Sequence, residues 1–416
     1  MEQVSVNRVN LLKQGSKIEY ENLLFCFAIA FQAVMAVFCQ TIRSFVSTRS
    51  LDTVFVYGLI AIVFIKAVPV FRFRISKVEF SVIITYCLIW IGSIAATTEF
   101  GSIMWETITD IIRTCLLVWL AARIVHMSQK LIIYLRLAAY IILLRAVLDL
   151  FVFSTGQKAF YSQYAGYQLF FGFSMLLVPM LIDKKWYDFA AGIICLLFTL
   201  FTGARGPFVF CIITFIICLL NVVGEKKKLF RVIPLILIIT VLIALNLQRI
   251  MRLILRFISI RGGSTRTIQT IIEGNIFSYT SGRENVYPIA LEYIKNHLLI
   301  GSGFINDRVY ISRQLGLLSE ITGSYAHNIF LEIGMQFGII LGSVIIVFLF
   351  RLFYQTYKQQ SSSEEKLFYT ALLCAAILPL LVSGSYLTFS MFYALLGYSF
   401  TDRQRRNRWR YLEDTI

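Results

Sequence analysis

Three short motifs carry the residue types in this chain that could do chemistry. They are Thr202-Gly203-Ala204-Arg205-Gly206, Ser281-Gly282-Arg283-Glu284 and Ala326-His327-Asn328. The first and third adjoin long apolar stretches, and the second lies in the long segment between them. Arginine forks match the oxygens of a phosphate or diphosphate, and an imidazole can accept a proton near neutral pH. The motifs therefore predict a site for an anionic, phosphate-bearing substrate.

Each arginine also has a purely structural interpretation. Arg205 lies between Gly203 and Gly206, and glycines let a backbone approach a ligand closely. An arginine at the end of an apolar span can equally snorkel to lipid headgroups. Arg283 could be a second phosphate clamp, or an exposed loop arginine beside Glu284. Neither arginine identifies a binding site by itself.

His327 is the strongest single indication of catalysis. The chain has 3 histidines, and this one begins an apolar stretch and is followed directly by Asn328. It could act as a general base toward a sugar hydroxyl, oriented by Asn328 or by a carboxylate. The alternative is an interfacial histidine that caps the following helix.

The composition indicates what holds these motifs. Of 416 residues, 58% are hydrophobic and only 15% are charged. Several apolar stretches approach the length of about 20 residues that a membrane-crossing helix needs. In a bilayer such segments must satisfy their backbone hydrogen bonds internally, so they should be helical. The predicted fold is all-α: a polytopic membrane protein with about twelve transmembrane helices and one large extracytoplasmic loop.

The predicted organisation has five parts. Residues 1–21 form a cytoplasmic tail, 22–247 hold nine spans, 248–326 form the extracytoplasmic loop, 327–400 hold three spans, and 401–416 form a basic cytoplasmic tail. The twelve predicted spans are 22–42, 52–71, 79–97, 104–125, 130–153, 167–182, 186–202, 206–223, 230–247, 327–350, 366–384 and 386–400.

Lysine and arginine counts set the orientation. One set of segments between spans carries 22 of these residues, and the alternate short loops carry 4. Because cytoplasmic loops are enriched in positive charge, both termini are predicted to be cytoplasmic and residues 248–326 to lie outside. The net charge of +16 is spread over many segments rather than one patch, which argues against nucleic-acid binding.

The sequence gives no sign of a metal or cofactor site. All 8 cysteines lie in predicted spans and none forms a CxxC pair, so they are expected to be packing residues. No DxD-like acidic motif stands near the three motifs. We therefore expect neither a metal nor a cofactor.

The ordered motifs resemble the superfamily of O-antigen ligases and Wzy-type polysaccharide polymerases, over roughly residues 190–345. The resemblance continues through the segments 290–304 and 326–338, which read Ala-Leu-Glu-Tyr-Ile-Lys-Asn-His-Leu-Leu-Ile-Gly-Ser-Gly-Phe and Ala-His-Asn-Ile-Phe-Leu-Glu-Ile-Gly-Met-Gln-Phe-Gly. Two positions depart from the family pattern: Leu298 stands where proline is frequent, and Ala204 where serine is frequent.

The resemblance implies glycosyl transfer on the extracytoplasmic face of a bacterial plasma (inner) membrane. The donor would be an undecaprenyl-diphosphate-linked oligosaccharide in the lipid bilayer. Arg205 and Arg283 would hold the diphosphate, and His327 would lie near the acceptor hydroxyl, with Asn328 as a further substrate-binding residue. Polymerases are the more numerous group, so a polymerase for O-antigen, capsule or exopolysaccharide is favoured over a ligase. A chain-length regulator and a flippase are expected partners.

Two other classes of protein fit parts of the pattern. A lipid-linked glycan flippase or transporter also needs many spans and cationic cavity residues, but a large loop with clustered motifs is more typical of an enzyme. An intramembrane serine protease could use Ser302 and His327. Ser302 lies outside the predicted spans, however, and the helical setting of such a nucleophile is absent.

Overall fold

The predicted all-α fold is confirmed for the part of the chain that the structure describes. The computed structural model describes residues 19–31, 33–34, 58, 76–96, 101–148, 163–202, 204–223, 252, 255–256, 283–317 and 324–400. Within these ranges the regular elements are helices and none is a strand. They include α3 (Lys77–Ala96), α6 (Gln129–Leu148), α7 (Gln163–Ile182), α9 (Arg205–Val223) and α14 (Ile329–Lys358).

These five helices are long and apolar enough to cross a membrane. The protein is therefore a multi-pass membrane protein. The predicted total of about twelve spans stays a prediction, because residues 52–71 and 230–247 lie almost wholly outside the described ranges. The predicted outer loop 248–326 is described only in part, and its membrane side also stays a prediction.

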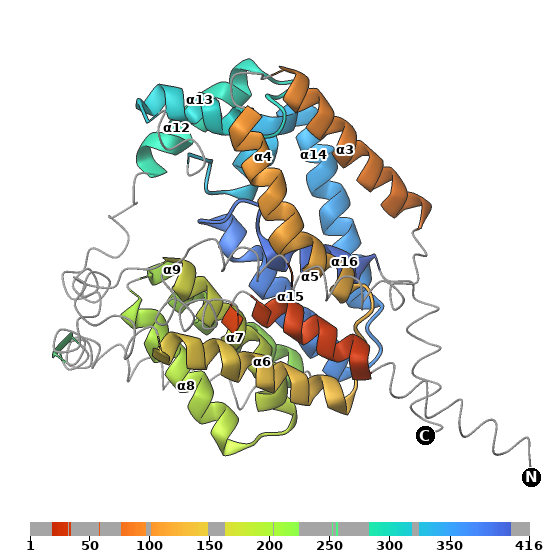
Figure 1. Ribbon diagram of the computed structural model, residues 1–416, viewed down its shortest axis with the longest axis vertical. Coiled ribbons are helices and arrows are strands. Elements are labelled where there is room, and N and C mark those ends of the chain that lie inside the picture. Colours follow the sequence, from red (N-terminus) through yellow and green to blue (C-terminus); the bar gives the residue numbers. More distant parts are fainter. Residues whose placement is uncertain are drawn as a thin grey trace, which may run out of the picture.

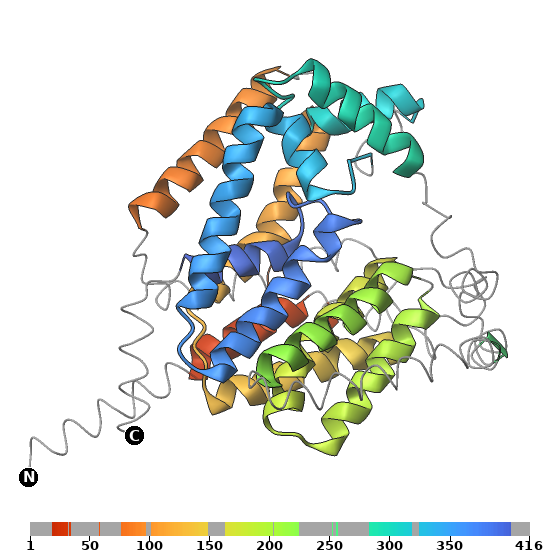
Figure 2. The same ribbon diagram turned by 180° about the vertical axis from the view of Figure 1, so that it is seen from behind.

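One half of the molecule is a bundle around α7 (Figures 1 and 2). Helix α7 packs against α6, α8 (Trp186–Phe201), α9 and α15 (Ser363–Ile377). Small residues allow this close packing: a Cβ placed on Gly172 would lie 3.1 Å from Ile142 of α6, and one on Gly166 would lie 2.9 Å from Ala204. Burial on all sides explains why α7 has no polar face.

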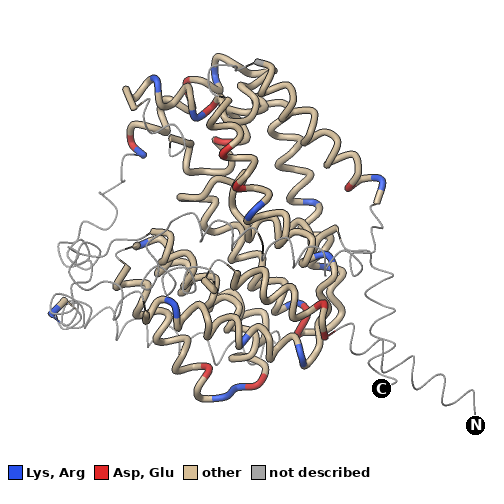
Figure 3. Tube along the Cα trace, in the orientation of Figure 1, with Lys and Arg blue, Asp and Glu red and all other residues tan. Residues whose placement is uncertain are grey.

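An ion cluster centred on the buried Asp188 joins α6 to the start of α8. The Arg136 guanidinium donates from Nε to both carboxylate oxygens of Asp188, at 2.9 and 3.1 Å, and from Nη2 to Asp183. The Tyr140 hydroxyl donates to Asp188 at 2.7 Å. These four residues are called the α6–α8 cluster. Charged side chains also gather in the nearby turn between α7 and α8 (Figure 3).

The other half contains α3, a continuous helical segment and the helices that precede α14 (Figure 1). The continuous segment consists of α4 (Gly101–Asp110), the π-helix η2 (Ile111–Leu116) and α5 (Leu117–Ala122). Two short helices, α12 (Arg283–Asn296) and α13 (Asn306–Leu315), pack on each other and on α14. The chain closes with η5 (Pro379–Leu381) and α16 (Ser390–Ser399), and α16 packs against α5.

Helix α14 is broken at Gly338, which has φ 75° and ψ 177°. The two arms fold back on each other, since a Cβ on Gly342 would lie 3.3 Å from Ile333 and 3.6 Å from the Cα of Gly334. A straight helix would separate residues 333 and 342 by about 13 Å. The predicted span 327–350 is therefore two helical arms rather than one continuous helix.

The segment 298–303 makes hydrogen bonds with the backbone amides and carbonyls that the break in α14 leaves unpaired. The Leu298 carbonyl accepts from the Ile339 amide at 2.9 Å, and the amides of Ser302 and Gly303 donate to the carbonyls of Met335 and Gln336. Gly301 is required here because a Cβ would lie 2.3 Å from the Gln336 backbone. The segment between α12 and α13 is thereby fastened to α14, and α14 carries the third motif at its start.

Candidate functional site

Asn328 and His327 have different roles at the start of α14. The Asn328 side-chain oxygen accepts from the amides of Phe330 and Leu331 at 2.9 and 3.3 Å, which is a helix N-cap. Its amide nitrogen donates to the Leu381 carbonyl at 3.0 Å. The helix cap is thus Asn328, which leaves His327 outside the helix. One amide hydrogen of Asn328 is still available for a substrate, so its predicted binding role stays a prediction.

The backbone at His327 is left-handed, with φ 54°. Few residues other than glycine adopt this conformation, and strained backbone is often found where a side chain must be aimed. The His327 ring lies 4.2 Å from the Tyr325 ring, measured between centroids. The two side chains therefore form a pair on one short segment.

The Ser383 carbonyl holds both side chains of this pair. It accepts from the Tyr325 hydroxyl at 2.7 Å and lies 3.3 Å from Nδ1 of His327. A carbonyl only accepts, so Nδ1 of His327 carries the hydrogen and Nε2 keeps its lone pair. This tautomer is the one that a general base needs, with Nε2 directed away from its anchor.

The surroundings of His327 favour its neutral form. Burial lowers the pKa of His327 below its usual value, and the positive charges of Arg283 and Arg308 lower it further, while the bond to Ser383 opposes them. An imidazole with a lowered pKa is unprotonated at neutral pH. Its charge and tautomer therefore both suit proton abstraction.

Arg283 is the first residue of α12, so it lies at a helix N-terminus rather than within a loop. Ser281 lies outside the described residues. Helix α12 packs on the first arm of α14 through a small apolar core that includes Ala290, Tyr293 and Met335. This packing brings the half-buried Arg283 within electrostatic range of His327. The structure thus brings the second and third motifs together.

Arg205 is the first residue of α9 and is half-buried. The N-terminus of a helix favours anions, and an arginine there adds a full positive charge. A Cβ on the adjacent Gly206 would lie 3.9 Å from the hydroxyl of Tyr167. Tyr167 is in turn within electrostatic range of Tyr325. Gly206, the residue after Arg205, therefore lies beside Tyr167, whose charge would act on Tyr325 of the His327 pair.

A second layer of charged side chains lies behind Tyr325. Arg308 donates to the Ser385 hydroxyl at 2.9 Å, lies 4.0 Å from Glu332, and stacks 5.3 Å from the centre of the Tyr325 ring. Ser385 donates to Glu332, which also accepts from the Tyr386 amide at 3.3 Å. Asp307, Arg308, Glu332 and Ser385 are called the site cluster.

None of these four residues lies in the three motifs, although Glu332 falls within the segment 326–338 that carries the family resemblance. Arg308 and Ser385 stand in no recognisable motif. Tyr325 is two residues before His327, but their ring contact depends on the left-handed backbone at His327, which the sequence does not reveal.

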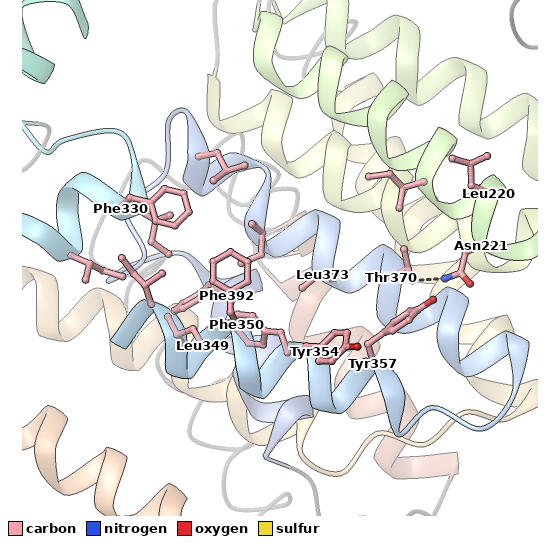
Figure 4. Close-up of a pocket in the computed structure, with 17 residues that line it drawn as sticks. Leu220, Asn221, Phe330, Leu349, Phe350, Tyr354, Tyr357, Thr370, Leu373 and Phe392 are labelled. Carbon is pink, nitrogen blue, oxygen red and sulfur yellow. Dashed lines mark hydrogen bonds between the residues drawn. The ribbon is translucent and has the colours of Figure 1, made fainter. Parts of the chain in front are cut away.

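An apolar pocket of about 680 Å³ lies between α9, α14 and α15 (Figure 4). At one end it is lined by Phe330, two residues after Asn328, and at the other by the hydrogen-bonded pair Asn221 and Thr370, 2.6 Å apart. Its wall includes Leu349, Phe350 and Leu373. The pocket could hold a hydrocarbon chain whose head lies near the start of α14.

Within the described ranges, no three His, Cys, Asp or Glu side chains are grouped as metal ligands would be. The described cysteines make no disulfide with one another. The expectation of a reaction without metal or cofactor stays a prediction that an assay must test.

Comparison with known families supports the reading of the motifs. Residues 190–346 match the family model described as O-antigen ligase. This confirms the resemblance, and the matched range holds Arg205, Arg283, His327 and the site cluster except Ser385. No curated protein matches the chain at a significant level. Members of the family are glycosyltransferase-like enzymes, which indicates a function of the ligase or polymerase type.

Proposed function

We propose that the protein is a polysaccharide polymerase of the bacterial plasma membrane. The matched range contains His327, whose ring is held in the tautomer that a general base needs. The protein would transfer a glycan from undecaprenyl diphosphate to a sugar hydroxyl of another lipid-linked repeat unit. The observation that carries the proposal is His327, which is fixed by Ser383 as the Nδ1–H tautomer and lies within range of the Arg283 charge.

The proposed reaction is a single displacement at the anomeric carbon. Nε2 of His327 takes the proton from the acceptor hydroxyl, and that oxygen forms a bond to the anomeric carbon of the donor glycan. The bond from this carbon to the diphosphate breaks, and its electron pair leaves with the diphosphate. Arg205 and Arg283 stabilise the negative charge that develops there.

The apolar pocket supports a donor with a long hydrocarbon tail. A polyprenyl chain in the pocket beside Phe330 would place its diphosphate near the start of α14. The proposed extracytoplasmic location of the site agrees with the charge bias of the loops.

The test is polymer formation by purified protein in lipid, with an undecaprenyl-diphosphate repeat unit and no added metal. His327→Gln keeps a polar side chain but removes the base, so turnover should fall about 10²–10⁴-fold. The matched control is His297→Gln, because His297 stacks on Tyr293 at the end of α12 and should not affect turnover. A wild-type rate for His327→Gln would rule out the base.

The two arginines are tested in the same assay. Replacing Arg205 or Arg283 by Ala should abolish product while the protein still inserts, and Lys should restore only part of the activity because it lacks the planar fork. Full activity of Arg205→Ala would remove Arg205 from the mechanism. A requirement for a divalent ion would contradict the metal-free reaction.

A ligase is the second candidate, because the matched family carries that name. The two functions differ only in the acceptor. Supplying both a second lipid-linked repeat unit and a glycolipid without diphosphate separates them: a ladder of products indicates a polymerase, and a single transfer to the glycolipid indicates a ligase.

A further inference from the structure

Arg308 is a buried arginine close to the proposed base that cannot itself reach a substrate in this arrangement. Its side chain is 4% exposed. Its guanidinium is engaged by Ser385, Glu332 and the face of the Tyr325 ring. Burying a charge lowers the stability of the fold unless bonds such as these compensate for it. Apolar side chains would pack here without that cost, so the presence of Arg308 indicates a role other than packing.

These contacts join three separate segments around His327. Tyr325 belongs to the segment that contains His327, Glu332 belongs to the first arm of α14, and Ser385 follows the Ser383 carbonyl that anchors both rings. A planar guanidinium can bond in its plane to Ser385 and stack its face on Tyr325 at the same time. An ammonium group can bond and contact a ring, but it lacks the planar face and the in-plane fork that fix both partners in this geometry.

We propose that Arg308 is a positioning residue for His327: it fixes the Tyr325–His327 segment against the 383–386 loop and places a permanent positive charge near the imidazole. The inference rests on the function proposed above. It assigns a role to a residue outside the three motifs, and that role does not include contact with the substrate.

The charge should also affect the protonation of His327. Among the described residues, the groups that act on His327 are Arg283 from α12, Arg308 from α13 and the Ser383 carbonyl, and Tyr325 packs on its ring. Both arginines lower the pKa of His327. Removing the Arg308 charge should therefore raise this pKa, and less of the base form would exist at a given pH.

The experiment measures polymerisation rate against pH for the full-length protein in lipid, at saturating donor. The wild type should lose activity on the acid side as His327 becomes protonated, and this limb should be absent in His327→Gln. That comparison tests the proposed function alone. If His327→Gln retains the limb, the base assignment fails before Arg308 is considered.

Arg308→Met then tests the inference. We expect a rate at least tenfold lower and an acid limb whose midpoint moves up by about 0.5–1 pH unit, a shift typical of losing one nearby charge. Arg308→Lys keeps the charge without the fork, so its midpoint should equal that of the wild type while its rate falls. Arg313→Met, an exposed arginine on the same helix, should match the wild type in both.

A lowered rate with an unmoved midpoint in Arg308→Met would show a merely structural role and overturn the inference. A wild-type rate in either Arg308 variant would also overturn it. If Arg308→Met does not fold, Arg308→Lys decides: a lowered turnover at unchanged donor KM and unchanged midpoint supports the inference, and wild-type turnover rejects it.

Discussion

The α6–α8 cluster and the site cluster both place one arginine against two carboxylates, but they differ in how completely the charges are bonded. In the α6–α8 cluster Arg136 donates to both aspartates, and Tyr140 adds a bond to Asp188. In the site cluster Arg308 remains 4.0 Å from Glu332. Neither oxygen of the fully buried Asp307 makes a hydrogen bond of good geometry with a described residue, although Gln336 and two backbone amides lie close enough to favour the charged carboxylate.

This difference separates a structural cluster from a functional one. A buried ion group supports the fold only when its hydrogen bonds are complete, whereas an incomplete one costs stability. Burial raises the pKa of Asp307 to about 6, and Arg308 and Gln336 offset this only in part. Such cost is typical of sites where side chains are aimed for chemistry rather than for stability.

The comparison predicts opposite effects for the same substitution in the two clusters. Asp188→Asn keeps the shape of the side chain but leaves the partly buried Arg136 with one carboxylate partner, Asp183, instead of two. Breaking a buried pair in this way should lower the free energy of unfolding by about 3–5 kcal/mol. The measurement is the melting temperature of the detergent-solubilised protein. It is monitored as the loss of the monodisperse peak in size-exclusion chromatography after heating.

Glu19→Gln is the matched control, because Glu19 of the predicted cytoplasmic tail lies 3.5 Å from Lys130 and both side chains are more than 40% exposed. Surface pairs contribute about 0–1 kcal/mol, so this variant should melt close to the wild type. Equal melting of Asp188→Asn and wild type would show that the α6–α8 cluster is not structural.

Asp307→Asn should stabilise the protein at neutral pH. The carboxyl binds its proton up to about pH 6 when folded but releases it near pH 4 when unfolded. Between these values the unfolded state binds fewer protons, so the wild-type free energy of unfolding falls as pH rises. An amide avoids this loss, which amounts to about 1–3 kcal/mol at pH 7.5.

The pH dependence distinguishes this explanation from a general gain in packing. The melting temperature of Asp307→Asn should exceed that of the wild type at pH 7.5, and the difference should shrink toward pH 4.5. A variant less stable than the wild type at pH 7.5 would mean that the Asp307 carboxylate is well compensated, and the contrast between the clusters would disappear.

The sequence could predict the helices and the chemical motifs, but not how the motifs are supported. Apolar length identified α3, α6, α7 and α9, because a helix is the way an apolar segment satisfies its backbone in a bilayer. The Gly338 break was missed, since one glycine within an apolar run does not reveal a reversal of direction. The motif residue Arg283 lies within electrostatic range of His327, while their shared side of the membrane stays a prediction.

The contacts behind His327 depend on tertiary structure and leave no local pattern. Ser383 acts through its carbonyl, which every residue type possesses, so its identity gives no signal. Arg308 becomes significant only because α13 packs beside the 383–386 loop, more than 70 residues away in sequence. Long-range placement of this kind cannot be read from one sequence without homologues.

The smallest expected effects come from removing one hydroxyl in each cluster. Tyr140→Phe loses the bond to Asp188, and Ser385→Ala loses the bonds that link Arg308 to Glu332. Each should lower the free energy of unfolding by about 0.5–2 kcal/mol, the net contribution of one or two hydrogen bonds. The variants should differ in activity instead: Tyr140→Phe should polymerise at the wild-type rate, whereas Ser385→Ala should be slower because Arg308 loses its anchor.

Since Ser385 would act through Arg308, the rate of the double variant Ser385→Ala/Arg308→Lys should fall little below that of Arg308→Lys alone. If the two rate losses multiply, Ser385 acts independently, and the site cluster is no more a functional unit than the α6–α8 cluster.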